Sequence, residues 1–337
     1  MTRMVYVANA DSGDLSVLAM LADGTLLPRG RVAVGGMVMP LAVSPCRRFL
    51  YAARRSEPYA VVSFAVDARS GALYRLGEAA LPHSMAYLAT DRGGRWLLSA
   101  SYPGDLIAVG EVDGDGIARE AHQVVATGPH AHAILAAPSN RHVLATSLGG
   151  GEVLLFAFDA ERGRLTPASP AALAMRPGAG PRHLRFHPGG RYVYLLNELD
   201  ARIDVLAFDA GQGTLALLDT VDTLPPGFAG EPWAADLQIT PDGRFLYSSE
   251  RRSSTLAVFG VQAGGGRLVP LGHHDTESQP RGFAIDPDGR FLIAVGQLSD
   301  HLSRYAIDPG CGALTLVERL AVGSNPNWVE IVDLPPD

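Results

Sequence analysis

Arginine supplies all of the permanently charged cationic side chains in this sequence. The chain has 28 Lys and Arg positions, and every one of them is Arg. The absence of lysine excludes a Schiff-base lysine and a phosphate-binding loop of the Walker type. The planar guanidinium of Arg forms paired hydrogen bonds to carboxylate and phosphate oxygens. Any anion-binding site in this chain must therefore be built from arginine.

Several other chemistries lack the residues that they need. No Gly-x-Ser-x-Gly segment is present, so a serine hydrolase built on that turn is not expected. His273 and His274 adjoin one another and lack the spacing of a zinc-binding pair, and no acidic cluster indicates calcium. We therefore expect no metal site.

Composition limits the partners and the location. The net charge of −7 argues against a general nucleic-acid surface. No apolar run reaches the roughly 18 residues of a membrane helix, and the N-terminal segment has no hydrophobic signal region. Cys46 and Cys311 alone do not indicate a disulfide framework. These features predict a cytoplasmic protein with no nucleic-acid partner and no membrane partner.

A repeated unit predicts the frame that positions the chemistry. Its first marker is a turn that ends in Arg before an apolar strand, at Arg3, Arg48, Arg95, Arg141, Arg191, Arg244 and Arg290. Its second marker is a hairpin Gly followed two residues later by Leu, at Gly24, Gly71, Gly163, Gly213, Gly266 and Gly312, with a degenerate copy at Gly116. Two markers that stay in step over the whole chain indicate seven repeats of about 45 residues.

Each unit has the pattern of four short strands. In the unit around Arg191 we expect strands over 182–187, 191–197, 202–208 and 214–220, joined by turn-rich segments. Seven such units predict an all-β fold, a seven-bladed β-propeller with four antiparallel strands per blade, as a single domain over 1–337. The chain starts at a second strand and ends with a first strand (327–331). We therefore expect the last blade to be closed by the N- and C-terminal strands.

Equivalent positions of the repeats locate the candidate site. At the start of the innermost strand, the seven units carry Met39, Ala86, His132, Arg182, Ala235, Arg281 and Asn327. At the end of the second strand, they carry Ala10, Arg55, Tyr102, Leu148, Glu198, Arg251 and Gln297. Antiparallel pairing places both columns at one mouth of the central channel, with His183, Trp233 and His301 close by in sequence.

The cluster at this mouth has four arginines and one glutamate. Like charges that converge repel one another unless an anion joins them, so we expect a small anionic ligand. Lactone hydrolysis would need a base for water and donors for the oxyanion. His132 suits the role of base, with Glu198 as the competing candidate. Arg182 or Arg281 would hold the oxyanion, and the remaining arginines a phosphate or carboxylate.

The same residues carry a resemblance to a known family. The motifs are Gly-Pro-Arg-His-Leu-Arg-Phe-His-Pro at 180–188, Asn-Glu-Leu at 197–199, Trp-Ala-Ala-Asp at 233–236, Thr-Pro-Asp-Gly-Arg at 240–244, Thr-Glu-Ser-Gln-Pro-Arg-Gly-Phe at 276–283 and Gly-Gln at 296–297. Together they resemble the bacterial propeller-type 6-phosphogluconolactonases, which share their fold with the carboxymuconate cyclases. The resemblance implies hydrolysis of 6-phospho-D-glucono-1,5-lactone to 6-phosphogluconate, in the pentose phosphate pathway and without a cofactor.

The resemblance also implies roles for individual residues. Through the cyclase relatives it suggests a catalytic set of His132, Glu198, Arg182 and Arg281. The other site candidates would bind the substrate, a small anionic sugar lactone; they are Arg55, Tyr102, His183, Trp233, Arg251, Gln297 and His301. We expect a monomer or a weak homodimer.

Two other functions use the same frame. A muconate-type lactonising cycloisomerase would use the arginines for carboxylates and His or Glu for proton transfer. A non-catalytic propeller scaffold, like the WD-repeat proteins, would carry apolar and aromatic residues at the mouth without converging charge. The repeated Gly-His and Trp-Asp signatures of that class are missing, apart from a lone Gly272-His273.

Overall fold

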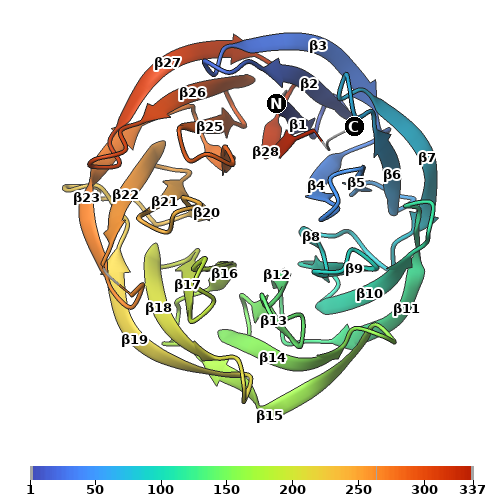
Figure 1. Ribbon diagram of the computed structural model, residues 1–337. Helices are drawn as coiled ribbons and strands as arrows, with labels where there is room; N and C mark the ends of the chain where they lie inside the picture. The colour runs from blue at the N-terminus through green and yellow to red at the C-terminus, as the bar shows by residue number, and fades with distance from the viewer. Residues whose placement is uncertain (1–2, 263, 335–337) are drawn as a thin grey trace.

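The fold is a closed ring of β-sheets around a central opening (Figure 1). The computed structural model of the protein describes residues 3–262 and 264–334. These residues form seven antiparallel sheets of four strands each, and no helix occurs among them. The prediction of an all-β, seven-bladed propeller is confirmed.

The blades are numbered here in chain order, and each is written from its innermost strand outward. Blades 1 to 4 comprise β28 (Pro326–Asp333), β1 (Arg3–Asn9), β2 (Asp14–Met20), β3 (Leu26–Ala33); β4 (Val38–Val43), β5 (Phe49–Arg54), β6 (Ala60–Val66), β7 (Leu73–Ala80); β8 (Tyr87–Thr90), β9 (Trp96–Ser101), β10 (Leu106–Val112), β11 (Ala118–Ala126); and β12 (Ala131–Ala136), β13 (His142–Ser147), β14 (Glu152–Asp159), β15 (Arg164–Ala174). Blades 5 to 7 comprise β16 (Pro181–Phe186), β17 (Tyr192–Asn197), β18 (Arg202–Asp209), β19 (Thr214–Asp222); β20 (Ala234–Ile239), β21 (Phe245–Glu250), β22 (Thr255–Val261), β23 (Leu268–Asp275); and β24 (Pro280–Ile285), β25 (Phe291–Gly296), β26 (His301–Ile307), β27 (Leu314–Ala321).

The core lies between neighbouring blades rather than within any one of them. The second strands β9, β21 and β25 are buried along their whole length, whereas the outermost strands such as β7 and β27 are largely exposed. One apolar cluster joins Tyr6 and Leu15 of blade 1 to Leu41 and Phe64 of blade 2. Face-to-face stacking explains why the inner strands are apolar on both sides.

The two sequence markers, the turn Arg and the hairpin Gly, lie where neighbouring blades pack against one another. The residue after each turn Arg packs against the hairpin glycine of the following blade, as Trp96 does against Gly163. Most of these glycines have positive φ, for example 63° at Gly163, and an added Cβ would meet the ring. Gly266 is the exception: positive φ falls at Gly264 and Gly265 instead, because the turn there contains three consecutive glycines.

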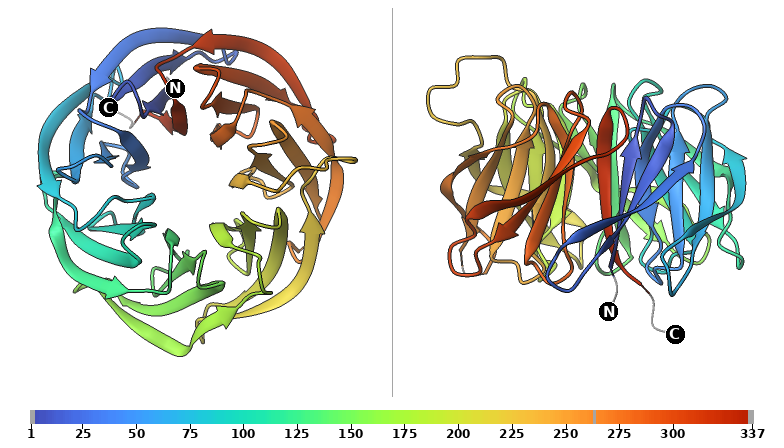
Figure 2. Two further views of the ribbon diagram at one scale, coloured as in Figure 1. Left: turned by 180° about the vertical axis from the view of Figure 1, so that it is seen from behind. Right: turned by 90° about the horizontal axis from the view of Figure 1, so that it is seen from above.

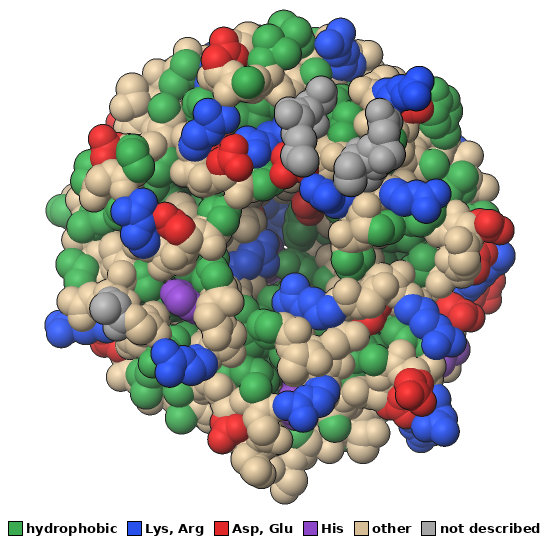
Figure 3. Space-filling view, viewed as in Figure 1, with side chains coloured by type: hydrophobic (Ala, Val, Ile, Leu, Met, Phe, Trp, Pro, Cys, Tyr) green, Lys and Arg blue, Asp and Glu red, His purple; other side chains and the backbone are tan. Residues whose placement is uncertain are grey.

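The ring closes through its two ends. Strand β1 pairs on one side with β2 and on the other with β28, from Arg3 opposite Asp333 to Asn9 opposite Pro326. The predicted closure by the N- and C-terminal strands is therefore confirmed. Both ends emerge on one face, and the long loop 223–233 projects from the opposite face (Figure 2). Figure 3 shows the face with the chain ends, where arginine side chains line the central hollow.

Candidate active site

The two predicted columns meet at the mouth opposite the chain ends. Glu198, just after β17, accepts a hydrogen bond on Oε2 from Nε of Arg182 on β16, at 2.7 Å. The same oxygen lies 2.9 Å from NH2 of Arg251, which follows β21 in the next blade. All three side chains are buried. The structure thus brings together one glutamate and two arginines from blades 5 and 6.

A β-bulge marks the site positions of the innermost strands. The strand register shifts between Ala131 and Ile134 in blade 4, and between Pro181 and His183 in blade 5. Similar shifts occur in blades 2, 6 and 7. An extra residue in one strand redirects its side chains and leaves backbone groups unpaired. The hydroxyl of Thr146 satisfies two such groups, since it accepts from the amide of the bulge residue Ala133 and donates to the Arg182 carbonyl.

Arg182 is held on a second side by a histidine. Its NH1 lies 3.0 Å from Nε2 of His183 and also donates to the Ala235 carbonyl. Nδ1 of His183 lies 2.8 Å from Oδ1 of Asp236, which as a carboxylate accepts the ring proton. Burial, then the charge of Arg182, holds the pKa of His183 well below its ordinary value. His183 is 2% exposed, and both of its ring nitrogens are occupied by Arg182 and Asp236.

His132 is a buried, neutral imidazole beside this group. Its ring centre lies 5.1 Å from that of His183 and 6.0 Å from that of Tyr102. Burial, followed by the charges of Arg182 and other cations, lowers the pKa of His132 well below its ordinary value. Its Nδ1 is buried without a hydrogen-bond partner among the described residues.

The other arginines differ in their partners. Arg251 stacks on Trp233 at 3.8 Å and donates to the Trp233 and Ala234 carbonyls. Burial, then Arg182, lowers the pKa of Arg251 to about 9. Arg55 donates from Nε to the Ser84 hydroxyl at 3.1 Å. Arg281 has no hydrogen bond or ion pair to any residue that the structure describes, and burial lowers its pKa well below the usual range.

Three predicted substrate-binding residues lie at the margin of this group. Tyr102 stacks on His130 with ring centres 4.2 Å apart. The amide of Gln297 bonds the side chains of Gln279 and Asn325. His301 begins β26, one strand further from the channel, and its ring bonds the Ser299 carbonyl. That contact does not join His301 to the arginines.

A second polar layer, which the sequence did not predict, lies deeper in the channel. Arg185 bonds the Tyr87 hydroxyl at 2.7 Å and lies beside a cavity of about 140 Å³. Glu330 lines this cavity, accepts from Nε1 of Trp328, and has its pKa raised by burial to about 7. Asp236 also lines this cavity, and it bonds His183 at the mouth. These residues share repeat positions that lie beyond the two columns. Tyr87, Asp236 and Trp328, like His183, directly follow a position in the first column, and Arg185 and Glu330 lie three residues after one.

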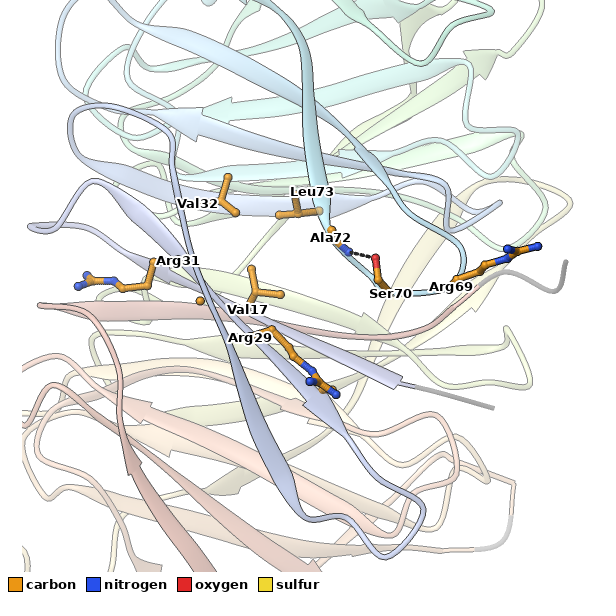
Figure 4. A pocket seen from close by; sticks show the side chains of 10 residues that line it. Val17, Arg29, Arg31, Val32, Arg69, Ser70, Ala72 and Leu73 are labelled. Atoms are coloured by element: carbon orange, nitrogen blue, oxygen red, sulfur yellow. Dashed lines mark hydrogen bonds between the residues drawn. The ribbon is translucent and has the colours of Figure 1, made fainter.

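A larger hollow lies away from the channel mouth. It measures about 610 Å³ and lies between β3 of blade 1 and the β6–β7 hairpin of blade 2 (Figure 4). Arg29, Arg31 and Arg69 line it, but Figure 4 shows them pointing away from one another. Charge therefore converges at the channel mouth and not here.

Two other kinds of feature do not occur in the described part of the chain. No group of three or more His, Cys, Asp and Glu side chains within 3–262 and 264–334 is arranged to hold a metal ion. Over the same residues no helix is long and apolar enough to cross a membrane.

The fold and the mouth together define a class: a seven-bladed propeller with an arginine-rich polar site at one end of its channel. A family model described as "Lactonase, 7-bladed beta-propeller" matches residues 3–331. The chain belongs to this lactonase family of seven-bladed β-propellers, and the predicted family resemblance is confirmed.

Individual relatives cover almost the whole chain. The 6-phosphogluconolactonase of Pectobacterium carotovorum subsp. carotovorum (strain PC1) is 41% identical over 334 residues, covering 99% of this chain and 100% of the relative. The 6-phosphogluconolactonase of Serratia proteamaculans (strain 568) is 40% identical, covering 98% and 99%. The solved structure of a periplasmic gluconolactonase from Pseudomonas aeruginosa has a TM-score of 0.91 at 29% identity, covering 99% and 100%.

Proposed function

We propose that this chain hydrolyses 6-phospho-D-glucono-1,5-lactone to 6-phosphogluconate. The observation that carries the proposal is the mouth itself, where arginines with free donors lie near a neutral histidine and the fixed Arg182–Glu198 pair. Relatives that bear the name 6-phosphogluconolactonase, at about 40% identity over nearly full length, support the choice of substrate.

The proposed reaction assigns His132 as the base. The neutral ring takes a proton from water as the water oxygen attacks the lactone carbonyl, and Arg182 donates to the oxyanion that forms. The ring C–O bond then breaks, the proton passes to the departing oxygen to give a hydroxyl, and the product is the open-chain acid. Arg281, with free donors, holds the substrate from another blade.

Glu198 is the weaker candidate for the base. Burial acts to raise its pKa, but the charges of Arg182, Arg251 and Arg281 outweigh burial and the net shift is downward. A carboxylate with two arginines on one oxygen is a poor proton acceptor. We assign Glu198 to holding Arg182 and Arg251 in place.

A coupled assay on freshly made 6-phosphogluconolactone tests the proposal, with the spontaneous rate subtracted. We expect the wild type to exceed that rate, and His132→Gln and Arg182→Met each to lower kcat by about 100-fold or more. His122→Gln, a change of the same type far from the mouth, serves as the control. A wild type that adds nothing to the spontaneous rate would refute the proposal, and full activity of His132→Gln would refute the assigned base.

Three further points stay predictions. We propose that the enzyme is a monomer or a weak homodimer, needs no cofactor and lies in the cytoplasm. Light scattering, an assay in chelator and cell fractionation test these points separately. The periplasmic location of the Pseudomonas relative makes the last test informative.

A further inference from the structure

The four arginines at the mouth fall into two sets by their partners. Arg182 and Arg251 share one oxygen of Glu198. Arg55 bonds only the neutral Ser84 hydroxyl through its side chain, and Arg281 has no partner within the described part of the chain. Neither Arg55 nor Arg281 forms an ion pair with a carboxylate of the described residues, although the charge of Glu198, which pairs with Arg182 and Arg251, also acts on Arg281. Their charge is therefore left for a ligand to neutralise.

The ring order places Arg55 and Arg281 away from His132 and Arg182, with Arg251 in the blade next to Arg281. Arg281 lies at the start of β24, Asn327 at the start of β28, and the amide of Arg55 bonds the Met37 carbonyl just before β4. The strands β24, β28 and β4 are neighbours around the channel. His132 and Arg182 lie at the start of β12 and β16, on the other side of the ring (Figure 1). The mouth thus has two poles, with the unbalanced arginines on either side of Asn327 and the candidate base opposite them.

Neutral amides support the pole around Asn327. Gln297 accepts from Gln279 at 3.1 Å and donates to Asn325 at 2.8 Å, so it ties together the segments that lead into Arg281 and Asn327. The carboxylates of this region, on Asp11 and Asp300, bond Asn325 and Ser324 rather than either arginine. These contacts fix this pole without placing a carboxylate in an ion pair with either arginine.

We infer that Arg55 and Arg281 form a subsite for the phosphate group of the substrate, which makes a phosphorylated aldonolactone the preferred class over a neutral one. The inference rests on the proposed function, since the opposite pole then faces the lactone carbonyl. Burial and neighbouring arginines lower the pKa of both side chains, because they disfavour the charged guanidinium. A bound phosphate dianion would offset this unfavourable energy. The fold alone leaves this choice open, because the Pseudomonas relative is a gluconolactonase by name.

Substrate preference in a matched pair of variants tests the inference. Arg55→Met removes the proposed contact, and Arg54→Met removes the same charge one residue away, where Arg54 bonds the Pro58 carbonyl and pairs with Glu78. We measure kcat/KM on 6-phosphogluconolactone and on gluconolactone. Arg55→Met should lower the ratio of the two values by about 10- to 100-fold, as Arg281→Met should, while Arg54→Met keeps the ratio within about twofold. Arg55→Lys should recover part of the loss.

Equal losses on the two lactones would overturn the inference, and so would the same change of ratio in Arg54→Met. Calorimetric binding of 6-phosphogluconate and gluconate then separates the subsite from catalysis. Tighter binding of 6-phosphogluconate that is lost in Arg55→Met supports the subsite even if the wild type opens neither lactone, in which case only the proposed function fails. Equal affinity of the wild type for both acids would reject the subsite whatever the enzyme hydrolyses.

Discussion

At the scale of single residues, Arg182 is positioned by a chain of buried hydrogen bonds. Asp236 accepts the proton on Nδ1 of His183, which leaves the lone pair on Nε2 to face NH1 of Arg182. Glu198 fixes Nε of the same guanidinium. The carboxylate of Asp236 therefore selects the histidine tautomer that Arg182 needs. Asp236 acts through His183 and Arg182, so we regard it as a positioning residue.

Replacing Asp236 with asparagine tests this role. The amide of the new side chain can donate to Nδ1 of His183, which moves the ring proton to Nε2 and sets it against an N–H of Arg182. We expect Asp236→Asn to lower kcat by about 10- to 100-fold and to change KM less than about threefold. Asp242→Asn, at an exposed turn, is the control. A loss confined to KM, or none in a folded variant, would contradict the role.

The two buried histidines also predict how stability depends on pH. Their folded-state pKa values are depressed, so between about pH 6.5 and those values the unfolded chain binds more protons than the folded one. Through these two residues the free energy of unfolding should therefore fall as the pH drops below about 6.5, by up to ~1.4 kcal/mol per pH unit for each histidine, and the raised pKa of Glu330 offsets part of this fall. Urea unfolding between about pH 5 and 8 measures the slope. His132→Gln should reduce it, and a slope as steep as in the wild type would count against the depressed pKa of His132.

Comparison of the repeats found the residues in the two columns at the strand ends and missed those one and three positions further along the innermost strands. His132, Arg182 and Glu198 were predicted because equivalent strand ends must meet at one mouth. Asp236 was missed because the column at that blade holds Ala235. The shift of register between Ala234 and Leu237 lets two consecutive residues of this strand contribute to the site. Strict alternation of side chains between the two faces of a strand would not allow this.

At the scale of strands and turns, local sequence predicted the elements closely. The strands expected over 191–197 and 214–220 are observed as β17 (Tyr192–Asn197) and β19 (Thr214–Asp222). The bulges were not predicted, because they depend on hydroxyls such as that of Thr146 on a neighbouring strand. The exact glycine of the β22–β23 turn was also missed, since several adjacent glycines can adopt positive φ.

The contact between a hairpin glycine and the preceding blade gives a prediction at the scale of strands and turns. Gly163 and Gly151 lie in two turns of blade 4, with φ of 63° and 68°. A Cβ on Gly163 would meet the ring of Trp96, whereas nothing lies within 4 Å of the same atom on Gly151. Both changes to alanine carry the cost of positive φ, and only Gly163→Ala adds a clash.

We expect Gly151→Ala to cost about 1 kcal/mol of unfolding free energy, and Gly163→Ala to cost a further ~1–3 kcal/mol. Denaturant midpoints at constant m-value measure both. Equal losses in the two variants would mean that Trp96 moves aside freely and that the glycine does not lock the blades together.

At the scale of the whole molecule, ring closure depends on contacts between the two ends of the chain. The order of strands at the termini predicted that β1 and β28 share a blade, because a missing innermost strand at one end is supplied at the other. The deeper channel layer was not predicted, because its residues lie one and three positions beyond the first column. Tyr87, Arg185 and Glu330 come from three different blades and meet only once the ring is closed.

The ion pairs of Arg3 stabilise this closure of the ring. Its side chain is 11% exposed, and its guanidinium lies 2.6 Å from Asp333 at the end of β28, 2.7 Å from Asp286 and 2.7 Å from Asp288 of blade 7. Arg95 occupies the same repeat position but is 56% exposed, with an acidic neighbour at 3.9 Å. Removing one member of a buried ion network leaves its partners uncompensated, whereas an exposed pair contributes little. Arg3→Met should therefore lower the free energy of unfolding by about 2–4 kcal/mol and Arg95→Met by less than ~1 kcal/mol. Similar losses in denaturant unfolding would show that the ion pairs of Arg3 add nothing to the β1–β28 pairing that closes the ring.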